Sequence, residues 1–114
     1  MVGPPASRLI FLRQSADIER VKKFGRRRQT SLFTLLTYAS GLLHPRIGVV
    51  VGKRFGIAVK RNRAKRLFRE LARLHRADLR DGQDILIYPR REALTVQHAE
   101  LREAWRKALT REVA

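Results

Sequence analysis

The segment from about Ile57 to about Arg76 is the part of the sequence that most constrains the fold. At about 100° per residue, its apolar residues gather on roughly a third of a helix circumference. This stripe consists of Ala64, Leu67, Phe68, Leu71 and Leu74. The opposite arc carries Lys and Arg almost throughout, with one carboxylate, Glu70, at its edge. The pattern predicts a helix that packs through the stripe and presents a cationic outer face.

The cationic arc needs negative charge from outside the chain. Its members are Arg61, Asn62, Lys65, Arg66, Arg69, Arg73 and Arg76. Like charges at i,i+4 oppose a helix by about 0.2–0.5 kcal/mol per pair, and the formal net charge of the 114 residues is +16. The partner is therefore expected to be nucleic acid or an anionic membrane. A membrane helix needs a wider apolar face with exposed aromatic rings, and a merely solvated face usually mixes signs, so the arc favours nucleic acid.

The rest of the chain predicts one mixed α/β domain. Helices are expected over residues 15–25, from Ser15 as N-cap to Gly25, and over 95–113. Residues 31–39, 46–53 and 84–89 are predicted strands, 8–12 an extended segment, 26–30 a basic connector and 81–83 a turn. The buried side of the last helix is expected to hold Val96, Ala99, Leu101, Trp105, Ala108 and Leu109. We assign residues 1–7 to a flexible tail and 8–114 to the domain.

The sequence offers no catalytic or metal-binding pattern of its own. It contains no cysteine, which excludes disulfides and thiolate metal sites. His44, His75 and His98 are scattered, and the carboxylates do not cluster as a two-metal nuclease requires. No apolar run approaches the roughly 18 residues of a membrane-spanning helix, and the first residues do not read as a signal peptide. We expect a cytoplasmic protein.

The basic segment resembles the signature of the bacterial ribonuclease P protein component. The signature has a lead-in of basic, apolar and Gly residues, here residues 53–59, followed by Arg61-Asn62-Arg63 and Lys65-Arg66-Leu67. The similarity also takes in "SRL" near the start, "RIGVVVGK" before the motif and "DILIYPR" after it, in the family's order.

The resemblance implies an α+β fold with the order α-β-β-β-α-β-α and a central four-stranded mixed sheet. It also implies a left-handed β-α-β crossover, whereas general rules favour a right-handed one. The implied protein is the subunit of an endoribonuclease that processes tRNA. It binds the catalytic RNA, one copy per RNA, and the 5′ leader of precursor tRNA, while that RNA and Mg²⁺ carry the hydrolysis.

The resemblance also implies two groups of site residues. Those expected to bind the catalytic RNA are Arg61, Asn62, Arg63, Lys65, Arg66, Arg69 and Arg73. Those expected in the leader cleft are Ile18, Lys22, Leu36, Tyr38, Lys53 and Arg54, where relatives often carry more aromatic rings. Strand alternation places Leu32, Thr34, Leu36 and Tyr38 on one face and Phe33 in the core. Two alternatives remain: a non-enzymatic RNA-binding protein of ribosomal or nucleoid type, and a self-sufficient nuclease.

Overall fold

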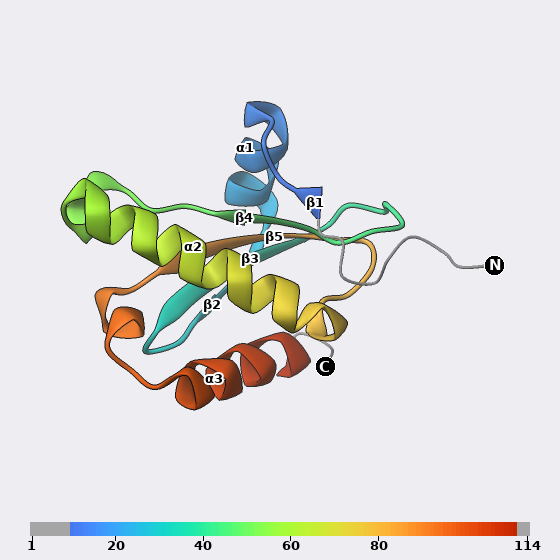
Figure 1. The fold of residues 1–114 in the computed structure, drawn as a ribbon. Helices are drawn as coiled ribbons and strands as arrows, with labels where there is room; N and C mark the ends of the chain where they lie inside the picture. Colours follow the sequence, from blue (N-terminus) through green and yellow to red (C-terminus); the bar gives the residue numbers. More distant parts are fainter. Residues whose placement is uncertain (1–9, 112–114) are drawn as a thin grey trace.

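A computed structural model describes residues 10–111, in which three α-helices pack against a mixed β-sheet (Figure 1). The helices are α1 (Ser15–Phe24), α2 (Ala58–Leu74) and α3 (His98–Arg111). The strands are β1 (Ile10–Phe11), β2 (Arg26–Gln29), β3 (Phe33–Ala39), β4 (Arg46–Val49) and β5 (Gln83–Pro89). Short 3-10 turns follow β4, α2 and β5: η1 (Lys53–Phe55), η2 (Arg76–Asp78) and η3 (Arg91–Leu94). The predicted tail, residues 1–7, lies outside the described residues.

The strand order is β1-β4-β5-β3-β2. β3 runs antiparallel to β2 and β5, whereas β4 runs parallel to β5 and β1. Four of these strands form the implied mixed sheet, and the two-residue β1 extends its edge. In Figure 1 the connection from β4 through α2 to β5 winds in the left-handed sense, which confirms the crossover that the resemblance implied. None of the helices among residues 10–111 is long and apolar enough to cross a membrane.

The two faces of the sheet carry different layers (Figure 1). α2 and α3 cover one face and α1 the other. Phe33 is fully buried in the main core, where its ring centroid lies 5.6 Å from that of Phe68 on α2 and 6.2 Å from that of Trp105 on α3. The prediction that Phe33 is a core residue is confirmed. The prediction that Leu32 lies on the other face of the sheet is wrong, because Leu32 precedes β3 and joins the same main core.

The apolar stripe of α2 matches the helical prediction except at its end. Ala64, Phe68 and Leu71 are buried and Leu67 packs against the core. Leu74 is 59% exposed, so its predicted burial is wrong. It is the last residue of α2, at the end of the apolar stripe.

Three other local predictions are corrected. Ser15 is the first helical residue rather than the cap; Gln14 occupies the N-cap position and makes no side-chain cap hydrogen bond. The predicted connector 26–30 is largely the strand β2, because its backbone pairs with β3 despite the weak strand propensity of three arginines. Ala99 is exposed, since it lies in the first turn of α3 before that helix reaches the core.

Gly25 ends α1, as predicted, for a packing reason. A Cβ at this position would lie 2.4 Å from the carbonyl oxygen of Val21 and 3.1 Å from that of Thr37. Only glycine lets the chain leave α1 so close to β3. This close approach fixes the C-terminal end of α1 against the sheet and thereby positions the cleft described next.

Candidate nucleic-acid interface

The outer face of α2 forms a cationic ridge, defined here as Arg61, Asn62, Arg63, Lys65, Arg66, Arg69 and Arg73. Arg61 and Lys65 are half-buried and the others are exposed. Glu70 is the only carboxylate of α2, and it forms an ion pair with Arg73. Among residues 10–111 no ion pair engages Arg63, Arg66 or Arg69. The ridge therefore presents uncompensated positive charge along one helix.

The sequence-predicted ridge residues come together because they share one helix, but two have additional contacts. The Cζ of Arg69 lies 5.8 Å from the ring centroid of Phe11, in cation–π range. The Nε of Arg61 is buried and has no hydrogen-bond partner among the described residues. Arg61 is thus half-buried and the exposed Arg69 contacts an aromatic ring, whereas Arg66 is simply exposed.

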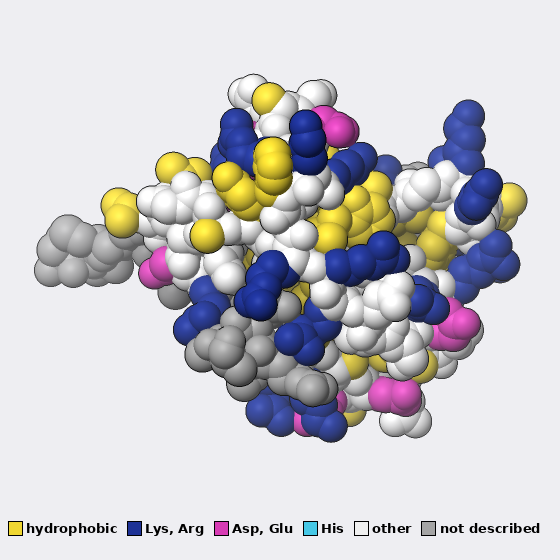
Figure 2. Space-filling view, turned by 180° about the vertical axis from the view of Figure 1, so that it is seen from behind, with side chains coloured by type: hydrophobic (Ala, Val, Ile, Leu, Met, Phe, Trp, Pro, Cys, Tyr) yellow, Lys and Arg dark blue, Asp and Glu magenta, His cyan; other side chains and the backbone are white. Residues whose placement is uncertain are grey.

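A cleft lies on the opposite face of the sheet, alongside α1. Figure 2 shows hydrophobic side chains beside α1, bordered by Lys and Arg. The central part is a cavity of about 510 Å³ that joins α1 to three strands. Its lining residues are Lys22, Arg27, Thr34, Leu36 and Tyr88. A cationic rim around an apolar floor suits a single strand, whose phosphates and bases need different partners.

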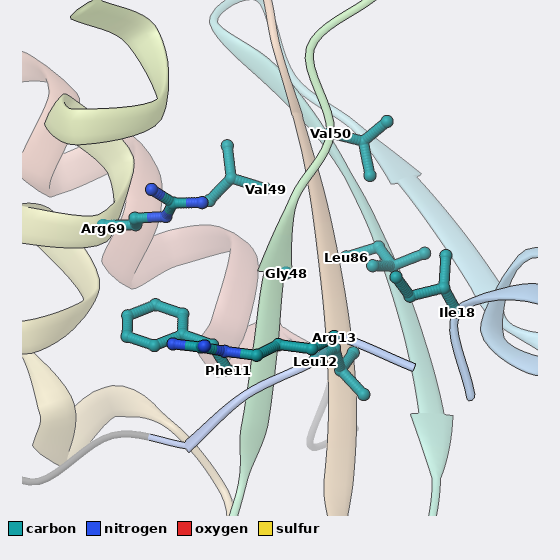
Figure 3. Close-up of a pocket in the computed structure, with 9 residues that line it drawn as sticks. All are labelled: Phe11, Leu12, Arg13, Ile18, Gly48, Val49, Val50, Arg69 and Leu86. Atoms are coloured by element: carbon teal, nitrogen blue, oxygen red, sulfur yellow. The ribbon is translucent and has the colours of Figure 1, made fainter. Parts of the chain in front are cut away.

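The predicted leader-cleft residues are not all brought into one cavity. Lys22 and Leu36 share the central cavity. Ile18 lines a second cavity at the β4 edge (Figure 3). Arg54 lines a third cavity of about 460 Å³ at the end of the sheet, and Lys53 is an exposed neighbour in the same turn, η1. Tyr38 is half-buried against the small core under α1 and is not part of these three linings.

Sequence reasoning missed Tyr88, which lines both the central cavity and the one beside Arg54. An aromatic residue near the end of a predicted strand was visible in the sequence. Its place in the cleft follows only from the strand pairing, in which Tyr88 on β5 lies opposite Thr34 on β3. Burial raises the pKa of the Tyr88 hydroxyl, the negative charge of Glu19 raises it further, and the positive charge of Arg27 opposes both. Tyr88 therefore stays a protonated hydrogen-bond donor at neutral pH, next to an aromatic face suited to stacking.

Two arginines hold the elements that frame the cleft. Arg46 on β4 donates two hydrogen bonds to Asp84 on β5 and a third, of 3.1 Å, to Asp17 on α1. The pKa of Arg46 is raised, chiefly by the hydrogen bonds to Asp84. Nη2 of Arg91 donates to the carbonyl oxygen of Arg54 over 2.7 Å, which braces η1. These contacts set where α1 and η1 stand relative to the sheet.

The histidines are less scattered than the sequence indicated. The rings of His75 and His98 lie 6.1 Å apart at the junction of α2 and α3. Folding brings this pair together although the two positions are 23 residues apart in the sequence. Residues 10–111 nevertheless contain no group of three or more His, Cys, Asp or Glu side chains that could hold a metal ion.

An α+β domain with a predominantly cationic helix face and a separate cationic cleft is typical of a nucleic-acid-binding protein. The family model described as Ribonuclease P matches residues 7–113. A ribonuclease P protein component from Syntrophus aciditrophicus is 34% identical over 101 residues, which cover 89% of this chain and 85% of that protein. The chain belongs to the ribonuclease P protein family.

Solved structures agree with this assignment. The ribonuclease P protein from Thermotoga maritima superposes with a TM-score of 0.80 at 31% identity, over 91% of this chain and 97% of that one. The Staphylococcus aureus ribonuclease P protein gives a TM-score of 0.75 at 26% identity, over 90% and 94% of the two chains. The structural similarity thus extends over about nine-tenths of this chain.

Proposed function

We propose that this chain is the protein subunit of a ribonuclease P in which a catalytic RNA performs the endonucleolytic cleavage. The ridge is the observation that carries this proposal, because its Lys and Arg side chains on α2 have almost no carboxylate to pair with. Phosphates of a structured RNA supply the missing charge, and their binding releases condensed counterions. Asn62, between two arginines, adds an amide that can reach a ribose or a base edge. One protein copy per catalytic RNA fits a single ridge.

The cleft beside α1 is proposed to hold the 5′ leader of precursor tRNA. Lys22 and Arg27 would contact phosphates, and Leu36 and Tyr88 line the same cavity. Lys53 and Arg54 stand on η1, at the end of the sheet where Tyr88 connects the central cavity to the next one. A leader crossing the sheet would meet cations at both ends and apolar surface between them.

The proposed chemistry belongs to the RNA and to Mg²⁺. The residues of the described chain do not form a ligand set for such an ion, so no Mg²⁺ ligand is assigned to the protein. We propose that Mg²⁺ is held mainly by the RNA and by the RNA–protein interface. The protein's role is to bind, orient and neutralise phosphate charge.

The test compares three reactions on precursor tRNA: protein with Mg²⁺, catalytic RNA with Mg²⁺, and both together. We expect no cleavage by protein alone, and cleavage by the mixture at lower Mg²⁺ than the RNA needs alone. The lower requirement follows because protein cations replace part of the ion atmosphere.

Two outcomes would contradict the proposal. Cleavage by RNA-free protein that survives nuclease treatment of the preparation would indicate a self-sufficient nuclease. Sequencing of RNA that co-purifies with the protein gives the second check: a heterogeneous pool, without one abundant structured RNA, would indicate a non-enzymatic RNA-binding protein instead.

A further inference from the structure

A cavity of about 460 Å³ lies where α1, α2 and the outer edge of the sheet meet (Figure 3). Figure 3 shows Arg69 reaching it from α2, Phe11 and Arg13 from the segment before α1, and Ile18 from α1 on the far side. The cavity therefore touches both the ridge and the cleft. Neither of those two sites, as described above, accounts for its Phe11 and Arg13 walls.

The backbone of β4 is open along this cavity. β1 pairs with β4 only at Arg46 and Ile47, and the last contact is the amide of Leu12 donating to the carbonyl of Ile47 over 2.8 Å. Among residues 10–111 no strand continues beside β4 past that point. The amide of Val50 donates to Ile87 on β5, so by strand alternation the N–H and C=O of Val49 point outward, toward the open edge.

The floor of the cavity includes Gly48, which has no side chain to extend into it. A Cβ there would lie 2.8 Å from Cδ2 of Leu86 and 3.4 Å from Cβ of Leu12. A side chain at this position would force the end of the Leu86 side chain, part of the apolar floor, to shift. The fold thus keeps a hollow next to an outward-facing N–H and C=O pair.

The walls carry positive charge and one aromatic ring. Arg13 and Arg69 are both exposed, and no acidic residue lines the cavity. The guanidinium of Arg69 lies 5.8 Å from the Phe11 ring centroid, so an aromatic and a planar cation stand together at one wall. Unpaired RNA bases are recognised by this combination: a stacking surface, hydrogen bonds to the base edge, and a cation for the phosphate.

We propose that this cavity binds one unpaired nucleotide of the catalytic RNA. The base lies against Phe11 and Arg69 and exchanges hydrogen bonds with the N–H and C=O of Val49, while Arg13 contacts the phosphate. The catalytic RNA is the occupant because Arg69 is itself part of the ridge, so an RNA docked there needs to turn only one base over the β4 edge. This inference rests on the function proposed above.

Base-specific chemical probing of the catalytic RNA tests whether the cavity binds an unpaired nucleotide. Complexes are formed with the parent protein, with Phe11→Leu, with Arg13→Ala and, as matched control, with Arg102→Ala on the exposed side of α3. We expect one unpaired nucleotide to be protected by the parent and by Arg102→Ala, and to regain reactivity with Phe11→Leu and Arg13→Ala. Loss of stacking should lower RNA affinity about 5-fold or more for Phe11→Leu.

The remaining outcomes overturn the inference. Identical protection by all four proteins would mean that the cavity is empty in the complex. If Phe11→Leu and Arg13→Ala leave the RNA footprint unchanged but abolish the preference for precursor over mature tRNA, the cavity binds the leader instead. A parent protein that binds no catalytic RNA would remove the proposed function as well, and is recognised by the absence of any footprint. Circular dichroism of Phe11→Leu checks that the fold is kept.

Discussion

The guanidinium of Arg46 on β4 forms a bidentate pair with the carboxylate of Asp84 on β5: Nε donates to Oδ1 over 2.8 Å and Nη2 donates to Oδ2 over 2.7 Å. Asp84 is 1% exposed, so its charge depends on this partner. Nη1 of Arg46 continues to Asp17 on α1. One side chain thereby joins both parallel strands to the helix that walls the cleft.

Removal of the Arg46 side chain should lower the stability of the fold. Arg46→Met keeps most of the side-chain length but leaves Asp84 buried and unpaired, which is expected to lower the free energy of unfolding by about 3–5 kcal/mol. Urea unfolding measures it. Asp17→Asn serves as the control, because its ion pairs are more exposed and should be worth about 1 kcal/mol or less. Equal losses in the two variants would show that the Arg46–Asp84 pair is not the critical contact.

The ridge predicts a salt-dependent affinity for the catalytic RNA. Replacement of Arg66 and Arg69 by Ala should weaken binding and make the plot of log affinity against log salt shallower by roughly 0.7–0.9 per lost phosphate contact. Far-UV circular dichroism should be unchanged, since both side chains are exposed. If affinity and slope equal those of the parent protein, the ridge is not the docking surface.

The cleft predicts leader binding that is largely electrostatic. Ile18 and Leu36 offer apolar contact, whereas Lys22, Lys53 and Arg54 offer phosphate contact. We expect the holoenzyme's preference for precursor over mature tRNA to shrink steeply with salt and to be nearly independent of leader base identity. The double variant Lys22→Ala, Lys53→Ala should remove most of it.

Tyrosine variants provide the counter-test for the leader. Tyr38→Ala should reduce the preference for precursor tRNA less than the double lysine change does. It should also reduce it less than Tyr88→Ala, because Tyr88 lines the central cavity and Tyr38 does not. Stacking is worth about 1–3 kcal/mol per base. A preference that resists salt and collapses with Tyr38→Ala would show that the cleft has been placed wrongly.

The pKa of Tyr88 reports on the charges around the cleft. Burial and Glu19 raise it above 10.0, and Arg27 lowers it. In a Tyr38→Phe background, phenolate absorbance should show Arg27→Gln raising the pKa further and Glu19→Gln lowering it. Because the folded state holds the proton more tightly, the stability from this group is present below about pH 10 and is lost as pH rises through the folded pKa. Absence of both shifts would place Glu19 and Arg27 away from the hydroxyl.

Local patterns predicted what depends on neighbouring residues. The helical period located α2 and its buried Phe68 and Leu71, and alternation assigned Phe33 to the core. The left-handed crossover was available only through the family resemblance, since general chain geometry favours the other hand. β2 was missed because its arginines carry no strand signal, and its existence depends on pairing with β3.

Features of the site that depend on distant residues escaped prediction. Arg46 and Asp84 are 38 positions apart, and nothing near either one indicates the other. Tyr88 enters the cleft only through its register with β3, and Phe11 meets Arg69 only because β1 joins the sheet edge beside β4. The sequence can show that such residues are cationic or aromatic, but the topology decides which surface they reach.

The arginine-rich strand β2 has a consequence for the isolated protein. β2 is the last strand of the sheet, so its outer side could template another strand, and exposed edges of this kind lead to aggregation. Three consecutive arginines repel a second copy of the same edge. The charge that suits RNA therefore also keeps newly made copies apart. Polyanions or high salt, which neutralise this repulsion, should bring the free protein closest to self-association.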